Sequence, residues 1–126
     1  VAAIGAARSS PDFRPMQVMN LALGGLFSSR INMNLREAHG YTYGASSGFA
    51  FRRAAGPFQV ASGIRTDVTA PAIDEIFKEL RGMVDKPVGA DELSVTALPA
   101  AAIGLAAAWT QNVSPTVVST NSWTLI

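Results

Sequence analysis

The chain has 126 residues, about the size of one domain, and 48% of them are apolar, which excludes an intrinsically disordered chain. Ten basic residues against nine acidic ones leave a formal charge of +1, which argues against nucleic acid or an anionic membrane surface as a partner. The absence of cysteine and the single histidine exclude a disulfide framework and a zinc site built from thiolates or several histidines.

The first segment of the chain predicts a strand followed by a helix. Residues 1–6 are a short apolar run that ends in the turn-forming sequence RSSPD, as expected of a strand. Ser10 or Asp12 can cap a helix that has Pro15 in its first turn, where the missing N–H does no harm. The glycine pair 24–25 is expected to end this helix.

A second helix is expected between the serine pair 28–29 and Gly40. The serines are favoured N-caps, and Ile31 and Leu35 lie four residues apart, on one face of a helix. Gly40 readily adopts the left-handed conformation that ends a helix. His39 is therefore expected to interact with the helix dipole at this end and not to bind a metal.

From Tyr41 the pattern changes to the alternation that is typical of a strand. The side chains expected on one face are those of Tyr41, Tyr43, Ala45, Ser47, Phe49 and Phe51. The turn sequence RRAAGP follows, and the alternation resumes over residues 58–64. The two runs predict a β-hairpin.

A third helix is expected from Thr69 as N-cap, with Pro71 in its first turn. Its apolar face is expected to hold Ile73, Ile76, Phe77, Leu80 and Met83. The sequence DKPVG ends it, and GADEL begins a further helix. Beyond Val95 the sequence is first helix-permissive and then β-prone, without a regular pattern.

The predicted order of elements is β-α-α-β-β-α-α. Helices that alternate with a hairpin favour an α+β fold, a two-layer sandwich with helices on one face of a mostly antiparallel sheet. We expect a single domain over residues 1–126, because neither a linker nor an internal repeat is visible.

No membrane span or leader is predicted. The longest apolar stretch, residues 97–109, is shorter than the ~20 residues that a helix needs to cross a bilayer, and it contains Pro99 and Gly104. The first residues lack the basic start and long apolar core of a signal peptide. Because the chain begins with Val1, we expect a mature or excised piece of a longer protein.

Three kinds of catalytic site find no support. A helical zinc-protease motif needs two histidines, and Glu37 and His39 are two residues apart, so their side chains diverge on a helix. A serine triad would depend on the same histidine, and no G-x-S-x-G sequence is present. The run LGGLFSSR lacks the Lys-Ser/Thr pair of a phosphate-binding loop.

Arg36 and Tyr43 are the strongest candidates for a functional pair. They lie seven residues apart across the turn at Gly40, so a helix end and the adjoining strand can bring a guanidinium and a phenol together. Both groups donate hydrogen bonds that suit a peptide carbonyl or a developing oxyanion. In the alternative interpretation, Arg36 pairs with Glu37 or another carboxylate, and Tyr43 lies at the edge of the core.

The run VMNLALGGLFSSRINMNLREAHGYTYGASSGF resembles the pitrilysin/insulinase family of zinc metallopeptidases, which includes subunits of mitochondrial processing peptidase. The motifs LGG-x-x-SSR, NLRE-x-x-GYTYG, G-x-F-x-V and T-D-x-T-x-x-A-x-x-E follow one another in the order of that family, and D-E-L comes later. The resemblance covers residues 1–93, whereas residues 94–126 depart from the family pattern.

This resemblance implies a processing-peptidase-like α+β domain and a division of labour between two halves. In the family, the zinc-bearing half carries H-x-x-E-H, and the other half contributes an arginine and a tyrosine that hold the substrate backbone. That pair matches Arg36 and Tyr43, while Tyr41 matches a variable position. No H-x-x-E-H is present, so the chain is not a self-sufficient enzyme and is expected to bind no metal itself.

We therefore expect one repeat of the non-catalytic half of a metalloendopeptidase. Its expected partners are a zinc-bearing homologous half, in the same polypeptide or a separate subunit, and an extended peptide held by strand addition to a sheet edge. An alternative is a structural or assembly module of the same fold without a proteolytic role. A nucleic-acid binder would need more basic surface than Arg52 and Arg53 supply.

Overall fold

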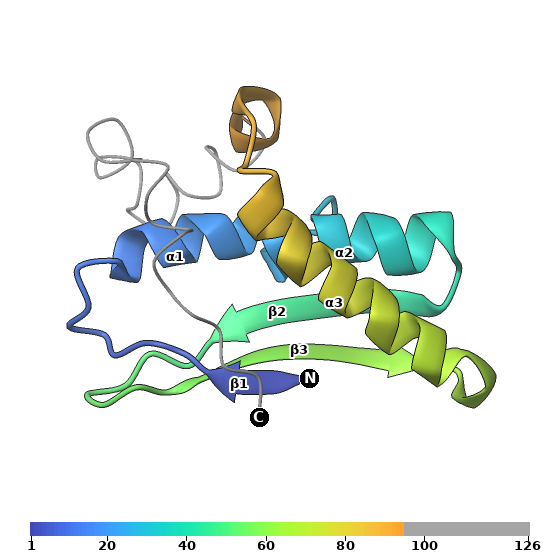
Figure 1. Ribbon diagram of the computed structural model, residues 1–126, viewed down its shortest axis with the longest axis horizontal. Helices are drawn as coiled ribbons and strands as arrows, with labels where there is room; N and C mark the ends of the chain where they lie inside the picture. Colours follow the sequence, from blue (N-terminus) through green and yellow to red (C-terminus); the bar gives the residue numbers. More distant parts are fainter. Residues whose placement is uncertain (95–126) are drawn as a thin grey trace.

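The computed structural model describes residues 1–94, which form a helical layer over one face of a small sheet (Figure 1). The strands are β1 (Ala2–Ile4), β2 (Thr42–Phe49) and β3 (Pro57–Ile64). The helices are α1 (Phe13–Asn20), α2 (Arg30–Asn32) and α3 (Thr69–Asp85), with π-helical extensions η1 (Leu21–Gly25) and η2 (Met33–Ala38) and a 3-10 turn η3 (Thr66–Val68). This arrangement confirms the predicted α+β sandwich. The expectations for residues 95–126 lie outside the described part of the chain.

The sheet is antiparallel, and its strand order is β1-β3-β2. The predicted hairpin of β2 and β3 is confirmed, with Phe49 opposite Phe58 near its turn. The first strand, β1, pairs with the other side of β3, where Ala3 lies opposite the same Phe58. Within residues 1–94, β2 is therefore an edge strand.

The core lies between the two layers. Its largest fully buried side chains are Leu23, Ile31 and Leu35, all from the first two helical stretches. The sheet contributes Ala45, Phe58 and Val60, and α3 contributes Ala72, Ile76 and Met83. Most of the predicted apolar face of α3 is thus confirmed, but Ile73, in its first turns, is 38% exposed.

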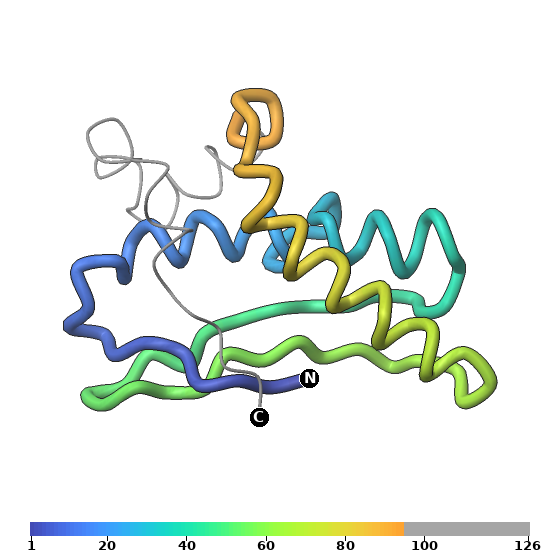
Figure 2. The backbone as a smooth tube through the Cα atoms, in the orientation of Figure 1, coloured from blue at the N-terminus to red at the C-terminus, as the bar shows by residue number. Residues whose placement is uncertain are grey.

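The second helix ends as predicted, and the chain reverses at Gly40. This residue has a φ of +62°, which glycine adopts without the strain that a side chain causes. The amide of Gly40 donates to the carbonyl of Arg36, and that of Tyr41 donates to the carbonyl of Leu35. Figure 2 shows the chain passing here from the helical layer into β2, which runs back beneath the helix.

The helix starts agree with prediction in position but not in capping. Ser29 occupies the N-cap of α2, yet its hydroxyl accepts a hydrogen bond from the Asn32 side chain and none from the helix backbone. The expectation that Thr69 caps α3 is wrong, because the 3-10 turn places Val68 at the cap position. The Thr69 hydroxyl instead donates to the carbonyl of Arg65, at 3.1 Å.

The alternation expected along β2 is broken by a β-bulge. Thr42 pairs with Ile64 and Ala45 with Ser62, so two residues of β2, Tyr43 and Gly44, oppose one residue of β3. The extra residue reverses the facing of the side chains before it. Tyr43 was expected on the same face as Ala45, and this expectation is wrong: Ala45 is buried, whereas Tyr43 is 99% exposed.

Candidate functional site

Arg36 lies in the last turn of η2, next to the reversal at Gly40. Its side chain is 31% exposed and forms an ion pair with the carboxylate of Glu37. The guanidinium also stacks over the ring of Phe27, at 4.0 Å from the ring centroid. Phe27 itself is 67% exposed. These two neighbours hold the Arg36 guanidinium near the surface of the helical layer.

Tyr43 lies on the bulge of β2, on the element that directly follows the Arg36 helix. Its side chain projects fully into solvent, and among the described residues its hydroxyl makes no hydrogen bond. An exposed phenol of this kind is free to donate to an incoming carbonyl. The suggestion that Tyr43 lies at the edge of the core is therefore wrong.

The structure brings Arg36 and Tyr43 onto adjoining elements but does not join them. Within residues 1–94, the hydrogen bond of the Arg36 guanidinium goes to Glu37, as one of the two interpretations of the sequence required. Because that ion pair is partly solvated, it costs little to replace. A substrate carbonyl can thus compete for Arg36 without breaking the fold.

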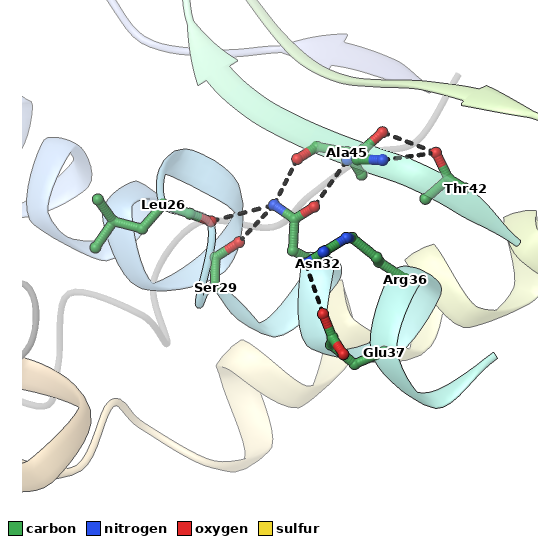
Figure 3. A network of polar contacts seen from close by, with 8 residues as sticks. Leu26, Ser29, Asn32, Arg36, Glu37, Thr42 and Ala45 are labelled. Carbon is green, nitrogen blue, oxygen red and sulfur yellow. Dashed lines mark hydrogen bonds and ion pairs between the residues drawn. The ribbon is translucent and has the colours of Figure 1, made fainter. Parts of the chain in front are cut away.

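Asn32 is the buried centre of the polar contacts between this helix and β2 (Figure 3), and no pattern in the sequence singles it out. Its side chain is on the helix one turn before Arg36, and the residue is 5% exposed. The Asn32 Oδ1 accepts from the amide of Ala45 at 2.8 Å, and Nδ2 donates to the Ala45 carbonyl at 2.6 Å. The same Nδ2 lies 3.1 Å from the carbonyl of Leu26. One side chain therefore ties the helix to the edge of β2.

Thr42 fixes the other side of the bulge. Its hydroxyl accepts from the amide of Gly44 at 3.1 Å and lies 2.8 Å from the carbonyls of Gly44 and Gly63. The Ser62 hydroxyl, on β3, donates to Thr42 at 2.9 Å. These contacts occupy the polar groups that the bulge removes from the ladder between β2 and β3.

A second asparagine holds β2 further along the same edge. Asn20 Nδ2 donates to the Ser47 carbonyl at 3.0 Å, and the Ser47 hydroxyl donates to Asn20 Oδ1 at 2.7 Å. The contact is possible because Gly24, one turn later, presents no side chain to Ser47. The first glycine of the LGG motif thus has a packing role.

The arginine of the SSR motif, Arg30, binds to the end of α3 and to the segment that follows it. Arg30 donates two hydrogen bonds to the carboxylate of Glu92, at 2.7 and 2.8 Å, and further ones to the carbonyls of Gly82 and Lys86. The Glu92 carboxylate raises the pKa of Arg30 above its ordinary value, although burial acts in the opposite direction. Arg30 therefore has a structural role.

His39 and the acidic face of α3 lie at the contact between η2 and α3. The His39 ring Nδ1 is 3.0 Å from the carbonyl of Asn34, at the end of η2, as predicted for a helix-end histidine. The Asn34 amide donates to both Glu75 and Glu79. The hydrogen bond from Asn34 to Glu75, followed by one from Lys78, lowers the pKa of Glu75 below its ordinary value. The arrangement stabilises the contact between η2 and α3.

Two further findings concern metals and membranes. Over residues 1–94, no three His, Cys, Asp or Glu side chains converge as metal ligands would. In the same part of the chain, no helix has the length and apolar character needed to cross a bilayer.

The profile of the peptidase M16 inactive domain family matches residues 1–96. The chain belongs to this family. The resemblance to the non-zinc half of pitrilysin-type peptidases is thereby confirmed, and membership of the inactive-domain family implies that this domain carries no catalytic zinc. No curated protein sequence matches the chain.

Solved structures share the fold of this M16 inactive domain. A peptidase M16 inactive domain from Pseudomonas fluorescens is 24% identical, with a TM-score of 0.77 over 94% of this chain and 31% of that one. A protease from Helicobacter pylori is 18% identical, with a TM-score of 0.73 over 82% of this chain and 25% of that one. A conserved protein from Enterococcus faecalis V583 is 23% identical, with a TM-score of 0.73 over 94% and 27% of the two chains. The chain thus spans less than a third of the length of these relatives.

Proposed function

We propose that the chain is a substrate-positioning, non-catalytic domain of a pitrilysin-type zinc metallopeptidase. It binds an extended peptide through Arg36 and Tyr43 and completes the active-site chamber of a zinc-bearing half. That half supplies the metal and its activated water. The proposal rests on membership of the inactive-domain family together with the matching positions of the two side chains.

The observation that carries the proposal is the presentation of Tyr43. A bulge turns this side chain out of the sheet, so that 99% of it is exposed, although tyrosine on a strand normally buries part of its ring. Bulges commonly re-aim a single side chain beside a functional site. Such full exposure stabilises nothing within residues 1–94, which favours a role in binding.

The chemistry of the pair suits a peptide bond under attack. The Tyr43 hydroxyl can donate to the carbonyl oxygen of the substrate as negative charge develops there. Arg36 has five N–H donors and uses one of them in its hydrogen bond with Glu37. Its remaining donors can hold a neighbouring carbonyl and so fix the register of the peptide.

The proposal is tested by Tyr43→Phe and Arg36→Ala in the assembled peptidase, with peptide turnover as the measurement. Removal of one oxyanion donor is expected to lower kcat about tenfold or more. The Tyr43→Phe change removes only a hydroxyl that is free within residues 1–94, so the fold should not change. Arg8→Ala is the matched control, because Arg8 also stacks on a ring, that of Phe13, away from the bulge.

Turnover that is unchanged in both site variants would contradict the proposal. If the variants and the wild type also assemble equally well with the zinc-bearing half, the alternative of a structural module gains support. A loss of turnover as large in Arg8→Ala as in Arg36→Ala would show that stacked arginines act through stability and not through substrate contact.

A further inference from the structure

The outer edge of β2 is closed by side chains where a strand could otherwise add. At Ala45, Asn32 accepts from the main-chain amide and donates to the main-chain carbonyl, at 2.8 and 2.6 Å. These are the two hydrogen bonds that a neighbouring strand makes with an outward-facing residue. At Ser47, Asn20 donates to the outward carbonyl at 3.0 Å. From Ala45 to Ser47, carboxamides thus replace the missing strand.

The closure stops at the bulge, next to Tyr43. Both residues that follow Tyr43 are anchored: Asn32 holds Ala45, and the hydroxyl of Thr42, the residue before Tyr43, holds both main-chain groups of Gly44. Tyr43 has no side-chain contact that could fix its own direction. Its orientation is therefore imposed by the anchored residues around it.

Asn32 is well suited to hold this geometry rigidly. It is 5% exposed, so water cannot readily replace its hydrogen bonds, and its Nδ2 also donates to Leu26 and Ser29. A buried carboxamide with its donors and acceptor satisfied has one low-energy orientation. A change at Asn32 is thus transmitted directly to Ala45 and the bulge.

We propose that Asn32 is a positioning residue that closes the edge of β2 at Ala45 and thereby presents Tyr43 to the substrate. This inference rests on the proposed function and makes it more specific. The substrate is held on this domain by the side chains of Tyr43 and Arg36, and not by main-chain hydrogen bonds to β2. The strand addition expected from the sequence is thus directed away from residues 45–47.

The first test is Asn32→Asp in the assembled peptidase, alone and combined with Tyr43→Phe. The carboxylate keeps the size of the side chain and can still accept from Ala45, but it repels the Ala45 carbonyl in place of donating to it. We expect kcat to fall about tenfold or more, since small misplacements of a positioned group have effects of this order. In the Tyr43→Phe background the same change should lower kcat less than about twofold.

Asn20→Asp is the matched control. It removes the corresponding donor to Ser47 on the same edge, away from Tyr43, and should leave kcat within about twofold of wild type. Equal losses of kcat from Asn32→Asp with and without Tyr43 would overturn the inference, because a merely structural effect does not depend on that hydroxyl. If Tyr43→Phe alone leaves turnover unchanged, the proposed function fails and the inference falls with it.

A second measurement is independent of activity. Hydrogen exchange of the segment 43–47 should be slow in the wild type, although β2 is an edge strand in residues 1–94, because Asn32 holds the Ala45 amide. Exchange in this segment should become at least about tenfold faster in Asn32→Asp. Unchanged exchange would overturn the closure of the edge while leaving the proposed function standing.

Discussion

Gly24 lies so close to β2 that no side chain fits between them. A Cβ at this position would lie 2.4 Å from Ser47 Oγ and 2.8 Å from the Ser47 amide nitrogen. The hydrogen bonds between Asn20 and Ser47 depend on this close approach. The glycine therefore positions the whole first helix against the edge of the sheet.

Gly24→Ala is expected to lower the free energy of unfolding by about 1–3 kcal/mol, the usual effect of overpacking a closed contact. Thermal or denaturant unfolding measures the change. Gly82→Ala is the matched control in α3, where a Cβ would meet nothing within 4 Å. It should be neutral or stabilising by up to about 1 kcal/mol. A destabilisation no greater in Gly24→Ala than in Gly82→Ala would contradict this packing role.

At the scale of single residues, the sequence identified the types of side chain better than their directions. It singled out Arg36 and Tyr43, but the alternation rule placed Tyr43 on the same face of the strand as Ala45, whereas the structure buries Ala45 and exposes Tyr43. A bulge depends on hydrogen bonds between distant residues, here from Thr42 and Ser62, and leaves no local pattern. The role of Asn32 could not be predicted from the sequence either, since a single buried asparagine on a helix produces no periodic pattern.

At the scale of elements, the ion pair between Arg30 and Glu92 connects the start of α2 with the segment after α3. Its side chain is 19% exposed, and that of its partner Glu92 is 31% exposed, so solvent screens this pair less than most surface pairs. The Arg30 guanidinium also donates to the carbonyls of Gly82 and Lys86, at the end of α3. We conclude that it fixes the angle between these two helices.

Arg30→Ala is expected to lower the free energy of unfolding by about 1–3 kcal/mol, because the Glu92 carboxylate and two carbonyls lose charged donors. Limited proteolysis should cut sooner within residues 86–94. Arg65→Ala serves as the control, since Arg65 and Asp67 are 64% and 69% exposed and should contribute less than about 1 kcal/mol. Equal stability of Arg30→Ala and wild type would contradict a stabilising role for the contacts of Arg30.

Most elements were predictable because their signals are local. The glycine at position 40, the hairpin turn and the helix breakers each depend on a few neighbouring residues, and the structure confirms their positions. The π-helical widening of the first two helices carried no such signal. The expected cap at Thr69 is wrong because a 3-10 turn, in which the Val68 amide donates to the Arg65 carbonyl, comes directly before α3 and places Val68 at the cap position.

At the scale of the whole molecule, this domain exposes the side chain of Tyr43 and holds that of Arg36 near the surface. Within residues 1–94, no three potential metal ligands converge. Its formal charge of +1 provides little long-range attraction for a charged substrate. Under the proposed function, selection of a peptide would then depend on contacts at short range, with Tyr43 and Arg36 on one side and a zinc-bearing half on the other.

The central claim is that Tyr43 faces the bound peptide, and photo-crosslinking tests it most directly. The residue is replaced by p-benzoylphenylalanine in the assembled peptidase, and a chelator prevents cleavage of the peptide. Gln59, exposed on β3, is the control position for the same replacement. We predict an adduct between peptide and protein from position 43 and little or none from position 59. Equal adducts from both positions, or none from position 43, would contradict the claim.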